Sequence, residues 1–151
     1  MLLALLNILS AGLFIGAIME VAIADIPLFA ELSRETFIIV HRGIDRNKHP
    51  FMPVYNVVAV ISALGELLFY RTFWEVLCIV VGVVSFLFVG VISETINVPL
   101  NRKIHAWSPD SGGEDVLVMR DKWIRAHYLR AAGGVFGFLV MVLPLLSIAK
   151  P

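Results

Sequence analysis

The sequence predicts an all-α membrane protein, a bundle of four transmembrane helices in which neighbouring helices are antiparallel. Composition is the first reason: 59% of the 151 residues are hydrophobic and 16% are charged, whereas soluble domains average about 45–50% and about 25%. Apolar segments long enough to cross about 30 Å of hydrocarbon are the second. The third is that positive charge gathers in two stretches between those segments.

The four apolar segments follow one another along the chain. The first, Met1–Met19, has no charged side chain, and its length favours a membrane helix over a cleavable signal peptide. The others are Phe51–Phe69, which is interrupted by Glu66, then Val76–Ile92 and Ala131–Ala149. With their flanking turns, we expect helices at about 1–30, 51–70, 74–106 and 114–149 of a single membrane domain covering 1–151. No clear internal repeat is visible.

Charge distribution predicts the topology. Ten of the twelve Lys and Arg residues lie in two stretches, 34–49 and 102–130. Because basic loops stay on the cytoplasmic side, we expect both stretches to be cytoplasmic loops and both termini to be outside. The formal net charge of zero gives no indication of a nucleic-acid partner. The expected partners are the lipid bilayer and a small hydrophobic molecule, and the sequence specifies no oligomeric state.

Two polar stripes overlap the second basic stretch. Each covers an arc of about 80° at 100° per residue, which is one face of a helix. The first stripe ends the third segment and the second begins the fourth: Glu94, Asn97, Asn101 and His105, then Arg120, Trp123, His127 and Arg130. Lys122 and Arg125 point away from the second stripe. Because polar groups are costly in hydrocarbon, we expect the stripes to face each other, with Asn97 and Asn101 near His127 or Arg130.

The first segment adds small residues and acids to this region. Gly12 and Gly16 favour close helix approach, and Glu20 and Asp25 follow them. With His41 and the two stripes, these acids predict a polar pocket at the cytoplasmic mouth, suited to a flat, apolar, weakly acidic molecule. No HxxxH or CxxC pair predicts a metal site. A haem or metal protein remains the alternative, with His41, His105 and His127 as its candidate ligands.

Several of these residues form a pattern similar to that of a known family. Asn97-Val98-Pro99-Leu100-Asn101, then Arg120 and Trp123-x-x-x-His127-x-x-Arg130, resembles the anthrone oxygenase family of small four-helix membrane proteins. Asp25-Ile26-Pro27 fits the first helix, although the family more often has Glu-His-Pro there. The positions that match are Asp25, Pro27, Pro99, Asn101, Trp123, His127 and Arg130.

This resemblance implies an oxygenase that acts on anthrone- or quinol-like aromatic molecules. Some members of the family are associated with oxidising anthrones to anthraquinones, a reaction that requires no cofactor. His127 would be the base, Arg130 and Asn101 would stabilise an oxyanion, and Trp123 would stack on the rings. Asn97, Glu94, Glu20 and Asp25 would complete the binding site. A non-enzymatic membrane subunit or scaffold is the remaining alternative.

Overall fold

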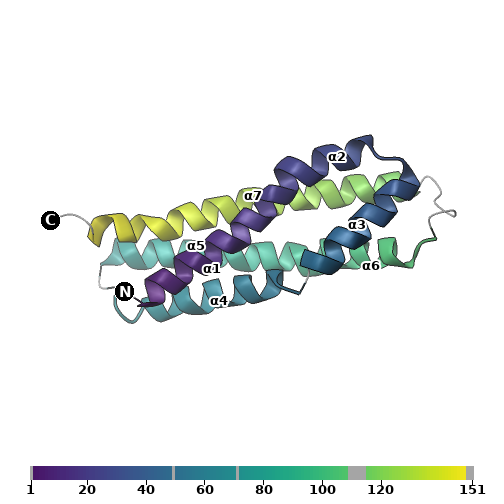
Figure 1. Ribbon diagram of the computed structural model, residues 1–151. Coiled ribbons are helices and arrows are strands. Elements are labelled where there is room, and N and C mark those ends of the chain that lie inside the picture. Colours follow the sequence, from purple (N-terminus) through teal and green to yellow (C-terminus); the bar gives the residue numbers. More distant parts are fainter. Residues whose placement is uncertain (1, 49, 71, 109–114, 149–151) are drawn as a thin grey trace.

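The structure, a computed structural model, describes residues 2–48, 50–70, 72–108 and 115–148, and these residues are almost entirely helical (Figure 1). Its first part contains α1 (Leu2–Glu20), the π-helical turn η1 (Val21–Asp25), α2 (Ile26–Glu31), α3 (Arg34–Lys48) and α4 (Met52–Glu66). Its second part contains α5 (Phe73–Ile92), the π-helical turn η2 (Ser93–Asn97), α6 (Val98–Ala106) and α7 (Asp115–Ile148). The predicted all-α class is confirmed. Glu114, the predicted start of the last helix, lies outside the described residues.

Three continuous helices of the described chain are long and apolar enough to cross a membrane: Leu2–Glu31, Phe73–Ala106 and Val116–Pro144. They identify an integral membrane protein. The second apolar segment of the sequence forms a shorter helix, because α4 contains 15 residues and therefore spans about 22 Å at 1.5 Å per residue. Beyond it, residues 67–69 form a turn rather than the further helix that the sequence predicted.

The stretch 34–49, which we expected to be a loop, is largely helical. Residues 34–48 form α3, which begins after Ser33, whose hydroxyl oxygen accepts a hydrogen bond from the Thr36 amide at 3.3 Å. The helix has charged residues on its outer face and an apolar stripe on the inner one, where Phe37 and Ile38 are fully buried. The many charged residues of this stretch favoured a loop, although its apolar residues recur at helical spacing. That spacing gives the helix one apolar face, which is buried against the other helices.

Two proline-linked turns shape the long helices. In η1 the Ile26 amide donates to the Val21 carbonyl, and in η2 the Val98 amide donates to the Ser93 carbonyl. Each bond therefore joins residues five positions apart, instead of the four of an α-helix. Pro27 and Pro99 follow immediately. Proline lacks an N–H and clashes with the carbonyl four residues before it, and a widened turn accommodates both effects.

The element order of the first half recurs in the second. Each half has a long apolar helix, a π-helical turn, a short helix that begins beside a proline, and a return across the molecule. The turns 21–25 and 93–97 are 72 residues apart, and Asp25-Ile26-Pro27-Leu28 corresponds to Asn97-Val98-Pro99-Leu100. This repeat is not evident in the sequence because only these few side chains carry it.

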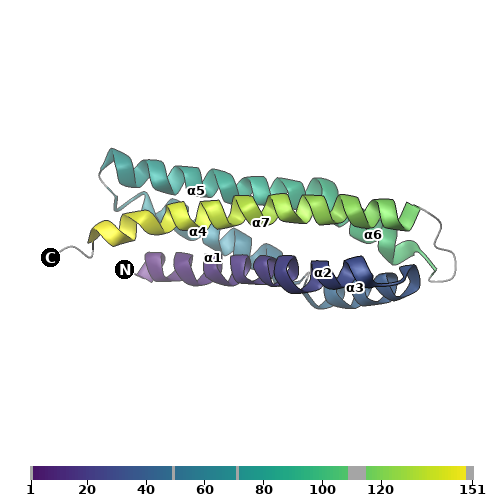
Figure 2. The same ribbon diagram turned by 90° about the horizontal axis from the view of Figure 1, so that it is seen from above.

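The halves pack against each other in a reciprocal way. α1 packs on α4 and α5 packs on α7 within the halves, while α1 contacts α7 and α4 contacts α5 between them. Phe14 and Phe86, again 72 residues apart, contact each other with ring centroids at 5.7 Å. Figures 1 and 2 show the two termini and the α4–α5 connection at one end of the molecule, with α2, α3 and α6 at the other.

Candidate functional site

A cavity of about 300 Å³ lies at the end of the molecule that contains α3 and α6. We call it the central cavity. Much of its wall is apolar, formed by residues such as Phe14, Phe29 and Val57. It is also lined by seven of the residues that the sequence singled out: His41, Glu94, Asn97, Asn101, Trp123, His127 and Arg130. Three residues of each polar stripe therefore line this cavity, whereas His105 and Arg120 do not.

Trp123 lies between two buried histidines. Its ring stacks on that of His127 with centroids 5.1 Å apart and planes 19° apart, and the edge-on ring of His41 is 5.0 Å from it. Both histidines are only 2% exposed. Burial, and secondarily the charge of His105, lowers the pKa of His41 to about 4, so this imidazole is neutral at pH 7.

The single hydrogen bond of His127 fixes its tautomer. Nε2 lies 3.0 Å from the backbone carbonyl oxygen of Ile18. A carbonyl oxygen only accepts hydrogen bonds, so Nε2 must carry the proton. In the neutral ring Nδ1 then has a free lone pair, and this buried atom has no hydrogen-bond partner among the described residues. The arrangement leaves a proton acceptor in the wall of the central cavity.

Other polar atoms of the cavity wall are also without partners in the described part of the chain. They are Oδ1 of Asn97, Oδ1 of Asn56, both ring nitrogens of His41 and Nε of Arg130. A buried polar group that makes no hydrogen bond costs about 1–3 kcal/mol. The central cavity thus concentrates several such costs, which a bound molecule carrying donors and acceptors would relieve.

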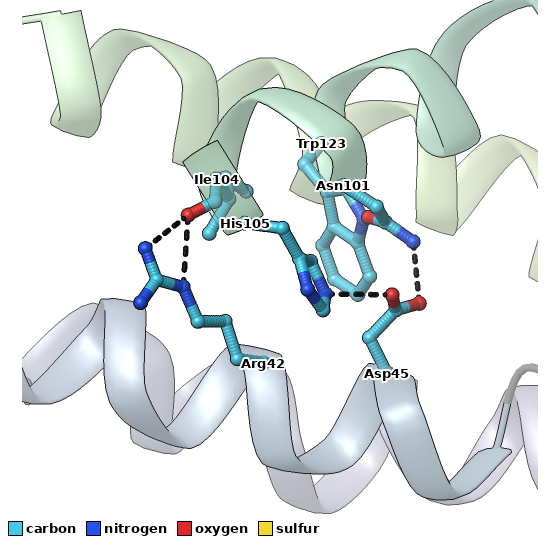
Figure 3. Close-up of polar contacts among 6 residues, drawn as sticks. All are labelled: Arg42, Asp45, Asn101, Ile104, His105 and Trp123. Carbon is cyan, nitrogen blue, oxygen red and sulfur yellow. Dashed lines mark hydrogen bonds and ion pairs between the residues drawn. The ribbon is translucent and has the colours of Figure 1, made fainter. Parts of the chain in front are cut away.

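Figure 3 shows a hydrogen-bonded chain that fixes the position of Trp123. The indole Nε1 donates to Oδ1 of Asn101 at 2.7 Å, and Nδ2 of Asn101 donates to Oδ1 of Asp45 at 2.6 Å. The other oxygen of Asp45 pairs with Nε2 of His105 at 3.0 Å. Sequence reasoning missed Asp45, although His41-x-x-x-Asp45-x-x-Lys48 has the same spacing as Trp123-x-x-x-His127-x-x-Arg130.

Arginines bind the short helices from the opposite half. Arg42 of α3 donates to the carbonyl oxygens of Ile104 and Trp107 at the end of α6, as Figure 3 shows for Ile104. Arg120 of α7 donates to the Phe29 carbonyl in α2 at 3.1 Å. These bonds satisfy carbonyls that a helix end leaves unpaired, and they join the halves around the cavity.

Asn97 and Asn101 line the same cavity as His127 and Arg130, but among the described residues neither asparagine makes a direct hydrogen bond to them. Both bind Trp123 instead, because Nδ2 of Asn97 donates to the Trp123 carbonyl at 3.3 Å, and Asn101 accepts from the Trp123 indole. Glu20 and Asp25 are not part of the cavity lining. They pair with Lys48, which lies 3.0 Å from Asp25 and also contacts Glu20. The two acids therefore hold a cavity-lining cation.

The three candidate metal ligands have different partners. His105 pairs with Asp45, His127 bonds to a backbone carbonyl, and the ring of Trp123 contacts both His41 and His127. Among the described residues, no group of three or more His, Cys, Asp or Glu side chains is arranged to hold a metal ion.

Comparison with known proteins identifies the family. The model of the anthrone oxygenase family matches residues 42–140, more than half of the chain. The match includes Asn101, Trp123, His127 and Arg130, whereas Asp25 and Pro27 precede it. No curated protein and no solved structure matches the chain. Asn101, Trp123, His127 and Arg130 all line the central cavity. Because the family model covers more than half of the chain, the chain belongs to the anthrone oxygenase family.

Proposed function

We propose that the protein is a membrane oxygenase that oxidises a hydrophobic aromatic molecule, anthrone- or quinol-like, in the central cavity. The observation that carries this proposal is Nδ1 of His127, which has no hydrogen-bond partner among the residues that the structure describes and is held in an acceptor tautomer by the Ile18 carbonyl. A positioned imidazole is an effective general base near neutral pH. The apolar wall and the flat face of Trp123 suit a planar ring system.

The reaction would begin with proton transfer from an acidic ring methylene to Nδ1 of His127. The resulting anion, an aryl oxide in one resonance form, gives electrons to O2, and a carbon–oxygen bond forms to give a peroxide that takes the proton back from His127. Loss of the second methylene proton then forms a carbonyl as the O–O bond breaks and water leaves. The carbon is oxidised, O2 is reduced, and no cofactor is required.

Arg130 would stabilise the oxyanion. Its guanidinium lines the cavity and its Nε has no partner in the described part of the chain. A positive charge already fixed in an apolar site stabilises developing negative charge without reorganising water. Asn97 supplies a free acceptor that could orient a ring hydroxyl, whereas Asn101 is engaged by Trp123 and Asp45 and would act through the tryptophan.

We also propose that α4 is a fourth crossing, which gives antiparallel neighbours, cytoplasmic basic stretches and external termini. The ten-to-two distribution of Lys and Arg supports this orientation. Cysteine labelling in sealed cells tests it, in a Cys78→Ala background. A Lys150→Cys probe should react with an impermeant reagent and a Lys103→Cys probe should not. Labelling of both, or of position 103 alone, would contradict the topology.

The chemical proposal is tested with purified protein in lipid nanodiscs, supplied with 1,8-dihydroxyanthrone and ¹⁸O2. We expect anthraquinone carrying one ¹⁸O in its new carbonyl, formed faster than by autoxidation. His127→Gln should lose about 100-fold or more of that excess rate, because glutamine can still donate to Ile18 but provides no base. Arg102→Gln, an exposed change on α6, is the matched control.

Two outcomes would contradict the proposal. An unchanged rate in His127→Gln would remove the base, and equal losses in both variants would indicate a general defect of the fold. A chelator should leave the rate unchanged, and a haem absorption band in the active protein would favour the alternative cofactor class.

A further inference from the structure

A second hollow lies on the outside of the helices that form the central cavity. This groove, of about 480 Å³, runs between the η2–α6 segment and α7, and we call it the outer groove. Its lining comprises Thr95, Ile96, Pro99, Leu100 and Lys103 on one side, and Lys122, Arg125, Ala126 and Leu129 on the other. We propose that the outer groove binds one anionic phospholipid, with its phosphate on the three cations and an acyl chain along the apolar floor.

The charges of the outer groove are all of one sign. Lys103, Lys122 and Arg125 are exposed and form no ion pair with any described residue, and no Asp or Glu lines the groove. Elsewhere at this end several charged groups are paired: Lys48 pairs with two acids, and Asp45 pairs with His105. An unbalanced cluster of three cations beside an apolar surface complements an anionic headgroup.

The order of residues along the groove matches the polarity of a lipid. On the η2–α6 side the apolar Ile96 precedes Lys103 by seven residues, and on α7 Lys122 precedes the apolar Leu129 by seven residues. Each spacing is about 10 Å along a helix. Figure 1 shows α6 and α7 running in opposite directions at this end of the molecule, so Lys103 and Lys122 belong to one end of the groove lining, and Ile96 and Leu129 to the other.

The internal repeat provides a comparison within the chain. At the repeat distance of 72 residues, Lys103 corresponds to Glu31, while Pro99 and Leu100 correspond to Pro27 and Leu28. The first half thus keeps the apolar residues and has an acid in place of the cation. The charge of the outer groove is a property of the second half and does not follow from the backbone geometry that the halves share.

Native mass spectrometry of the full-length protein in detergent, with added phosphatidylglycerol or phosphatidylcholine, tests this proposal. We expect one phosphatidylglycerol to bind more tightly than phosphatidylcholine. The double variant Lys122→Gln/Arg125→Gln should weaken that binding roughly 30-fold, since each interfacial cation contributes about 1 kcal/mol. The control Arg46→Gln/Arg102→Gln removes two exposed cations from the same end, outside the groove, and should retain binding.

Four outcomes would overturn the proposal. Equal weakening in both double variants would indicate attraction to surface charge in general, and equal affinity for the two lipids would remove the role of the anionic headgroup. Displacement of the lipid by millimolar inorganic phosphate would show a site for free phosphate. Dimerisation that the Lys122→Gln/Arg125→Gln variant abolishes would identify a second copy of the chain as the occupant. None of these outcomes depends on the chemistry proposed for the central cavity.

Discussion

The two halves of the molecule share a backbone plan and differ in what their side chains leave unsatisfied. His41, Asp45 and Lys48 of α3 have the same spacing as Trp123, His127 and Arg130 of α7, and all six line the central cavity. In the first half Asp45 and Lys48 are fully engaged by partners. In the second half His127 and Arg130 each keep a buried polar atom without a partner among the described residues.

This difference indicates that the two similar halves have different roles. Groups whose hydrogen bonds are satisfied within the protein contribute to its architecture, whereas groups left unsatisfied in a cavity are available to a ligand. In the function proposed above, α7 would therefore contribute the reactive groups, and α3 would support them. His41 of α3 and Asn56 of α4 are exceptions in the first half, because both ring nitrogens of His41 and Oδ1 of Asn56 lack a partner in the described part of the chain.

The largest effect should come from Arg130 and Lys48, the cations that end the two patterns of equal spacing. Arg130→Lys keeps the charge but loses the planar guanidinium, and should reduce kcat for anthrone oxidation by about 100- to 1,000-fold. Lys48→Arg can still pair with Glu20 and Asp25 and should cost no more than roughly threefold. Steady-state kinetics on both variants measures the contrast. Similar losses in the two would show that the halves contribute equally to the chemistry.

His41 gives a pH-dependent test of one of these exceptions. Its pKa of about 4 in the folded protein, against about 6.5 unfolded, means that the unfolded state binds more protons between these values. The free energy of unfolding is therefore highest above pH 6.5 and falls by about 3 kcal/mol as the pH is lowered toward 4. Unfolding in a mixed-micelle titration at pH 7 and pH 4 should show this loss, and His41→Phe should lack it. Parallel pH curves for the two proteins would contradict the assignment.

Glycines distinguish the helix contacts of the halves. The sequence favoured Gly12 and Gly16 as the sites of close approach, yet a Cβ on Gly16 would meet nothing within 4 Å. A Cβ on Gly137 would lie 2.7 Å from Cβ of Ser85 and 3.1 Å from the Phe86 ring. Gly137→Ala should thus lower the free energy of unfolding by about 2 kcal/mol, and Gly16→Ala should not lower it. The same unfolding titration measures both, and equal losses would show that this contact does not distinguish the halves.

These contrasts show which features the sequence could predict. Apolar length and composition predicted an all-α membrane protein. The Trp123-x-x-x-His127-x-x-Arg130 spacing placed three side chains on one helix face, and these three residues line one cavity. Contacts between distant segments could not be read in the same way. The helix α3 was not predicted because its many charged residues favoured a loop. The role of Asp45 depends on Asn101, which is 56 residues away in the sequence. The repeat was missed because it preserves backbone geometry more than residue identity.

The smallest effect concerns Asp45, which we expect to act as a positioning residue. Asp45→Ala removes the acceptor that orients Asn101 and, through Asn101, the indole of Trp123. Loss of one such hydrogen bond should reduce kcat/KM about tenfold. Asp45→Asn keeps an oxygen that accepts from Asn101 and should restore most of the activity, although it removes the ion pair with His105. If the role of Asp45 were only to attach α3 to α6 through that ion pair, Asp45→Asn and Asp45→Ala would be equally impaired. Recovery in the asparagine variant alone would therefore assign the effect to the orientation of Trp123, with an architectural residue in the first half supporting the reactive face of the second.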